Sequence, residues 1–122
     1  MTAREIRQQA ARVLDEMPDE FREQLHNLEI VVQPRPSKRQ MQEMELDAHD
    51  AVLYGLYEGT PLPDRSSLAP PILPDKITLF SEALVRDFPD PEDLREQIRV
   101  TVLHEIAHYF GMDDEQIEKL GY

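Results

Sequence analysis

The sequence contains no cysteine, which excludes disulfide bonds and metal sites built from thiolates. No apolar run approaches the roughly 20 residues that span a bilayer, and the first residues lack the apolar segment of a secretory signal. Basic residues are also few: 13 Lys and Arg stand against 25 Asp and Glu, which gives a net charge of −12 and a pI near 4.6. Such a charge repels phosphate backbones and anionic lipids, so we expect no nucleic-acid partner and no membrane partner. Together these absences predict a cytoplasmic protein with an acidic, solubilising surface or, alternatively, one that prefers basic peptides.

The length of 122 residues fits one domain, residues 1–122, with a modest hydrophobic core. Hydrophobic periodicity and turn residues predict an α+β fold. Helices are predicted over residues 3–16, 18–25, 82–88, 91–110 and 115–120, and strands over residues 28–33, 51–57 and 76–80. Thr2 and Glu5 form a capping box for the first helix. Pro18 suits position N1 of the second helix, and Ser81 is the predicted N-cap of the third.

Glycine and proline mark the segments around the second strand. Residues 34–50 are predicted to form a loop with one helical turn near 40–46, and the proline-rich residues 59–74 a second loop. Gly55, inside the predicted strand 51–57, indicates a bulge or a close approach of another part of the backbone.

The longest predicted helix starts at Asp90, a good N-cap that is followed directly by a proline suited to N1. An apolar residue recurs at every fourth position, at Leu94, Ile98, Val102, Ile106 and Phe110. At 100° per residue, the last three of these point roughly 160–240° away from His104. We therefore expect one buried side, and an opposite side that presents Thr101, His104 and His108 to a cleft. Gly111 supplies the left-handed residue that ends the helix.

The exposed side of this helix carries the pattern His-Glu-x-x-His, formed by His104, Glu105 and His108. Two histidines four residues apart lie one turn apart on the same face, so both imidazoles can bind one metal ion. Glu105 is rotated by about 100° from His104. It can reach a metal-bound water without acting as a ligand, which is the arrangement of zinc hydrolases.

The chain continues with Gly111, and Asp114 lies six residues beyond His108, so the pattern extends to His-Glu-x-x-His-x-x-Gly-x-x-Asp. This resembles the metzincin signature, in which the glycine turns the chain and a third ligand, usually His, comes under the metal. It is most similar to a family of small bacterial zincin-like metallopeptidases that have Asp in this position. Other parts of that family's pattern resemble residues 53–59, 73–80 and 120–122. The resemblance, carried by about the last 70 residues, implies Asp114 as the third ligand; Asp113 and Glu118 are the alternatives.

The resemblance implies a minimal zincin-like fold, with a small mixed sheet packed on an N-terminal helix and a C-terminal active-site helix. It also implies Zn²⁺ as the cofactor and a peptide or protein as the substrate. Zincins bind an extended substrate along an edge strand, for which residues 51–57 are the candidate; an ordinary core strand is the alternative. No methionine follows Asp114, so the Met-turn of metzincins is missing.

Zinc held by His104, His108 and Asp114 would lower the pKa of a bound water from ~15.7 toward ~7 and polarise the scissile carbonyl. Glu105 would be the catalytic general base. The candidate donors to the oxyanion are Tyr54, Tyr57, Tyr109 and His49, with Tyr57 favoured. His26 is expected to be a solvated or capping residue. The predicted function is that of a zinc metallopeptidase, a hydrolase; the alternative is a non-catalytic zinc-binding module that interacts with another protein.

Overall fold

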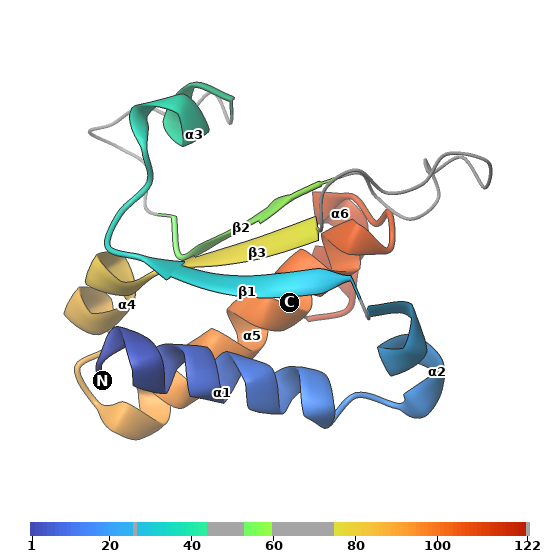
Figure 1. Cartoon of the computed structure of the whole chain (residues 1–122), viewed down its shortest axis with the longest axis horizontal. Coiled ribbons are helices and arrows are strands. Elements are labelled where there is room, and N and C mark those ends of the chain that lie inside the picture. Colours follow the sequence, from blue (N-terminus) through green and yellow to red (C-terminus); the bar gives the residue numbers. More distant parts are fainter. Residues whose placement is uncertain (26, 44–52, 60–74, 122) are drawn as a thin grey trace.

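The computed structural model (Figure 1) describes residues 1–25, 27–43, 53–59 and 75–121. Its helices are α1 (Ala3–Asp15), α2 (Asp19–Arg22), the 3₁₀ helix η1 (Glu23–Leu25), α3 (Lys38–Glu43), α4 (Ser81–Asp87), α5 (Pro91–Tyr109) and α6 (Asp114–Lys119). Its strands are β1 (Leu28–Gln33), β2 (Gly55–Glu58) and β3 (Asp75–Phe80). None of the helices in these ranges combines the length and the apolar character that a bilayer crossing requires.

The three strands form one mixed sheet in the order β1-β3-β2. β1 pairs with β3 in parallel, beginning with Leu28 opposite Asp75. β2 pairs with β3 in the antiparallel direction, beginning with Gly55 opposite Leu79. β3 is therefore the central strand, and in the described part of the chain β2 forms an edge of the sheet.

The two longest helices pack on one face of this sheet, α1 against β1 and α5 against β2 (Figure 1). α1 begins with the predicted capping box, in which the Thr2 hydroxyl accepts a hydrogen bond from the Glu5 amide. Apolar side chains of both helices meet those of β1 and β3 between the two layers: Ile6, Ala10, Ile30, Ile77, Leu79, Leu94, Ile98, Val102 and Ile106. The predicted α+β fold, with a small mixed sheet on an N-terminal and a C-terminal helix, is confirmed. Its core fixes α5 under the edge strand β2.

Two predicted helix starts differ from the structure. Ser81 is the first residue of α4 rather than its N-cap, and its hydroxyl donates to the Gln33 carbonyl oxygen at 3.4 Å. The reason is that β3 runs into α4 without an intervening turn, so Phe80 takes the cap position. Pro18 occupies the N-cap of α2 rather than N1, and the predicted helix 18–25 divides into α2 and η1.

The segments around β2 also differ in their boundaries. The predicted strand 51–57 begins later, at Gly55, and residues 51–52 lie outside the described part. The helical turn expected near residues 40–46 is α3, which starts two residues earlier; residues 44–50 of that predicted loop lie outside the described part. The same holds for residues 60–74 of the second predicted loop.

Candidate metal centre

α5, the helix that carries the histidines, begins and packs largely as predicted. The Asp90 side chain accepts hydrogen bonds from the amides of Glu92 (2.9 Å) and Asp93 (3.2 Å), which caps the helix. Its apolar stripe is buried as far as Ile106, whereas Phe110 at the end is only half-buried. This stripe anchors α5 in the core.

A second stripe of α5 is buried as well, beneath β2. Thr101, Glu105 and Tyr109 recur at every fourth position and are only 7%, 6% and 2% exposed. The prediction that Thr101 faces a cleft is wrong, because Thr101 packs against Gly55 of β2, where a Cβ would lie 2.5 Å from Thr101 Cγ2. The sequence predicted a bulge or a close approach of backbone at Gly55; the structure shows a close approach, but it is made by the Thr101 side chain. The sequence does contain this second four-residue period, but its side chains are polar, so a search for apolar periodicity does not identify it as buried.

The turn after α5 brings the next acidic residues back toward the helix. Gly111 has φ 90°, in the left-handed region that glycine tolerates. Its amide donates to the His108 carbonyl, and the Met112 amide to the Ala107 carbonyl, at 2.9 and 3.0 Å. This pair of backbone hydrogen bonds is the Schellman motif, and it ends the helix as predicted. Asp113 then caps α6, and Asp114 is the first residue of that helix.

Two imidazoles and one carboxylate converge at this turn. Asp114 Oδ1 lies 3.6 Å from His104 Nε2 and 3.2 Å from His108 Nε2. The two imidazole rings are 4.9 Å apart between centroids. Around a tetrahedral zinc ion with bonds of about 2.0–2.1 Å, neighbouring ligand atoms lie about 3.3 Å apart. Asp114 Oδ1 therefore lies from each imidazole nitrogen at about the spacing that such an ion requires.

Electrostatics favour the metal-binding form of His108. Burial, reinforced by the neighbouring His104, lowers the pKa of His108, while Asp114 and a hydrogen bond to the Met112 backbone act in the opposite direction. A lowered pKa keeps the imidazole neutral, and only the neutral form can offer a nitrogen lone pair to a metal.

Glu105 lies beside these donors but is held by β2. It is 6% exposed, and its Oε1 accepts a hydrogen bond from the Tyr57 amide at 3.0 Å. Burial raises the pKa of Glu105 to about 7; the Tyr57 amide opposes this shift and the Asp114 charge adds to it. His104, Glu105 and His108 offer ligand atoms that all lie within 4.8 Å of one another. The Glu105 carboxylate therefore lies next to both imidazoles.

The alternative third ligands are placed differently from Asp114. The Asp113 side chain accepts from the Gln116 amide and closes a capping box, so it is engaged in the helix start. Glu118 is exposed on α6, and in the described part of the chain the ion pairs that join α6 to the two histidines both come from Asp114. The geometry brings Asp114 alone of the three against both imidazoles.

The hydroxyls of the three candidate tyrosines are directed elsewhere. Tyr54 donates to Asp87 at 2.7 Å, Tyr57 to Asp75 at 2.8 Å and Tyr109 to the Gln24 carbonyl at 2.6 Å. The favoured assignment of the Tyr57 hydroxyl as an oxyanion donor is not supported, because that hydroxyl is bonded to a buried carboxylate. His49 and His26 lie outside the described residues. Sequence reasoning did not single out Asp75, although a carboxylate at the first position of a buried strand is a usable signal.

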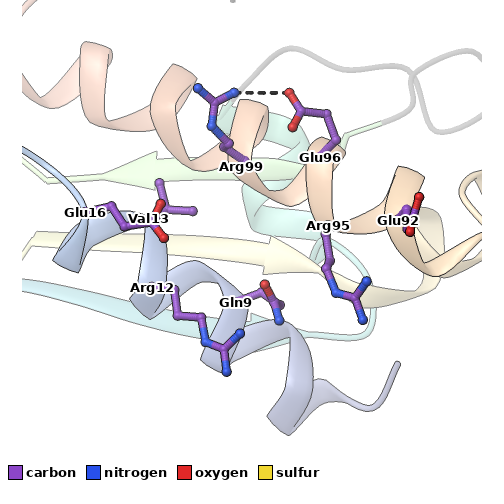
Figure 2. A pocket seen from close by; sticks show the side chains of 8 residues that line it. All are labelled: Gln9, Arg12, Val13, Glu16, Glu92, Arg95, Glu96 and Arg99. Carbon is purple, nitrogen blue, oxygen red and sulfur yellow. Dashed lines mark hydrogen bonds and ion pairs between the residues drawn. The ribbon is translucent and has the colours of Figure 1, made fainter.

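A separate groove of about 280 Å³ lies between α1 and the first half of α5 (Figure 2). Its charged lining consists of three arginines and three glutamates: Arg12, Arg95, Arg99, Glu16, Glu92 and Glu96. Their formal charges cancel, and Arg99 pairs with Glu96 at 3.1 Å. The groove holds no histidine, so we place the candidate chemistry at the other end of α5.

The chain matches a known protein family. The model of a family described as zincin-like metallopeptidases matches residues 25–122, which is most of the chain. The match starts at the end of η1 and includes β1. It is therefore longer than the resemblance seen in the sequence, which is carried by about the last 70 residues. No curated protein gives a significant match.

Proposed function

The chain belongs to the zincin-like metallopeptidase family, and on that premise we propose that it is a zinc-dependent peptidase that hydrolyses peptide bonds. One observation carries the proposal: the buried carboxylate of Glu105 stands beside His104 and His108, while Asp114 faces both imidazoles. Ligands from His104, His108 and Asp114 would leave the fourth position of a zinc ion open, as in catalytic rather than structural sites. Burying an ionisable group is unfavourable, so a base for chemistry is the better account of Glu105.

We assign the metal ligands as His104, His108 and Asp114. Bound there, zinc supplies a Lewis acid that acidifies a water and polarises the scissile carbonyl. Asp114 in place of a third histidine reduces the positive charge of the site, so we expect a somewhat weaker Lewis acid than in a three-histidine centre.

Glu105 is assigned as the general base. With Oε1 held by the Tyr57 amide, Oε2 is the oxygen that would take a proton from a water at the site and pass it to the leaving amine. A pKa of about 7 suits both transfers, because a group that must accept and then release a proton works best near the working pH. A cation bound nearby would favour the ionised form of Glu105 and so lower this pKa from its raised value.

The substrate is proposed to lie along β2. The Phe80 amide donates to the Tyr54 carbonyl, and bonding alternates along an antiparallel pair. The amide and carbonyl of Gly55 and the carbonyl of Tyr57 therefore point away from β3, toward the edge of the sheet. An extended peptide would pair with these groups and so run past Glu105.

The test is cleavage of a defined mixture of unstructured peptides by the zinc-loaded protein, followed by mass spectrometry. We expect new termini with the wild type and a loss of about 10²–10⁴-fold in rate with Glu105→Gln. Glu118→Gln, an exposed glutamate on α6, is the matched control and should cleave at the wild-type rate. Zinc binding without cleavage by the wild type would refute the peptidase proposal and favour the non-catalytic zinc-binding module.

A further inference from the structure

Tyr57 contacts the proposed general base through its backbone rather than through its hydroxyl. Its amide donates to Glu105 Oε1 at 3.0 Å. In the antiparallel pairing with β3, the bonded positions are Tyr54, just before β2, and Leu56 and Glu58 within it, so the amide of Tyr57 points out of the sheet edge. The position of this single amide therefore sets where the Glu105 carboxylate is held.

The Tyr57 side chain ties that amide to the centre of the fold. Its hydroxyl donates to Asp75 Oδ1 at 2.8 Å, and Asp75 is 1% exposed at the start of the central strand β3. Its ring meets Tyr109 edge to face at 5.9 Å between centroids. The Tyr109 hydroxyl is in turn bonded to the Gln24 carbonyl. Tyr57 is thus fixed at the hydroxyl end to the sheet and at the ring to α5.

The backbone of Gly59 packs directly against the hydrogen bond between Tyr57 and Asp75. A Cβ at Gly59 would overlap the Asp75 carboxylate and would lie 2.9 Å from the Tyr57 hydroxyl oxygen. Gly59 also has φ 155°, at the limit of the region that favours glycine. The Tyr57–Asp75 bond is therefore enclosed by bare backbone, where a side chain would displace it.

We propose that the Tyr57–Asp75 hydrogen bond is a positioning device for Glu105, which acts through the Tyr57 amide; the inference rests on the proposed role of Glu105 as general base. Tyr57 and Asp75 are positioning residues, because neither side chain is directed at the reacting atoms. A glutamate side chain has three rotatable bonds, and a base must lie within about 2.6–3.2 Å of the proton it takes. Anchoring Oε1 restricts those rotations and leaves Oε2 for the proposed proton transfer.

The first test measures amide hydrogen exchange at residue 57 by NMR, in zinc-free and zinc-loaded protein. Tyr57→Phe removes only the hydroxyl, and Asp75→Asn keeps the shape of the acceptor. We expect either change to reduce the protection of amide 57 about tenfold, since its bond to Glu105 becomes looser. Leu56, whose amide faces β3, is the internal control and should keep its protection. Tyr54→Phe, which removes another tyrosine hydroxyl near β2, is the matched control.

The second test measures peptide cleavage by the same variants. We expect Tyr57→Phe and Asp75→Asn to lower kcat about tenfold or more with little change in KM, because the base is mispositioned while the strand edge remains. Unchanged protection of amide 57, a parallel loss at Leu56, or an unchanged kcat despite lost protection would each overturn the inference. A wild type that cleaves nothing would refute the proposed function, while exchange at amide 57 would still decide whether the Tyr57–Asp75 bond holds Glu105.

Discussion

The contact between Gly55 and Thr101 is a steric prediction that can be worked out in numbers. A Cβ at Gly55 would lie 2.5 Å from Thr101 Cγ2, whereas carbon atoms in contact are about 3.5–4.0 Å apart, so the overlap is about 1 Å. The added methyl group cannot move away from Thr101 within the sheet, because Leu79 Cδ2 and the Thr78 carbonyl oxygen would lie only 3.3 and 3.4 Å from it. Gly55→Ala must therefore push β2 away from α5.

The expected size of the effect follows from two opposing contributions. Overpacking of this kind costs about 1–3 kcal/mol. Gly55 is not among the described glycines with positive φ, so alanine has no backbone penalty and recovers about 0.5–1 kcal/mol of chain entropy. We expect Gly55→Ala to lower the free energy of unfolding by about 1–2 kcal/mol.

The assay is urea unfolding of zinc-free protein, followed by circular dichroism, in a double-mutant cycle with Thr101→Ser. Serine removes Cγ2 but keeps the oxygen that accepts from Gln97 at 3.1 Å. The double variant should recover about 1 kcal/mol relative to the sum of the two single losses. A Gly55→Ala variant as stable as the wild type, or a coupling energy near zero, would refute the proposed contact between β2 and α5.

Three further outcomes are expected. Folding raises the pKa of Glu105 from 4.5 to about 7, so its contribution to stability is full below about pH 4.5 and is lost as the pH rises through 7. In zinc-free protein, the wild type should therefore lose stability relative to Glu105→Gln as the pH rises from about 4.5 to above 7, by on the order of 3 kcal/mol in the free energy of unfolding. Free energies of unfolding that change with pH in the same way for both proteins would contradict this. Asp113→Ala should destabilise α6 by about 0.5–2 kcal/mol and, because α6 carries Asp114, weaken zinc binding in a chelator competition. Asp113→Asn should keep the stability and the zinc affinity of the wild type. Equal zinc affinities in the wild type and both variants would argue that the Asp113 cap does not position Asp114. Tyr109→Phe should cost about 1 kcal/mol in urea unfolding by removing the 2.6 Å bond to Gln24, and no loss of stability would show that this bond is unimportant.

Local signals in the sequence predicted the elements whose causes are local. The capping box of Thr2 and Glu5, the cap at Asp90 and the left-handed turn at Gly111 each act within a few residues, and all three are found in the structure. The histidine spacing places both imidazoles on one face for the same reason. The N-cap of α4 differs from the prediction at Ser81, because β3 continues directly into the helix and Phe80 takes the cap position.

What the sequence could not supply are contacts between distant segments. The Tyr57 amide meets Glu105 across 48 residues, and the Tyr57 hydroxyl meets Asp75 across 18. Both depend on the strand order, which brings β2 to the sheet edge above α5. Periodicity likewise identified only the apolar stripe of α5, since a polar residue such as Thr101 gives no sign of burial until its neighbour is known.

The measurement that tests the central claim most directly is zinc content per chain. We would determine it by elemental mass spectrometry after purification without a nickel column or chelator, for the wild type, Asp114→Ala and the control Glu118→Ala. The proposed ligand set predicts about one zinc per chain in the wild type and the control, and a large loss in Asp114→Ala. Zinc retained at the wild-type level by Asp114→Ala, or absent from the wild type even after zinc is added, would contradict the three-ligand centre.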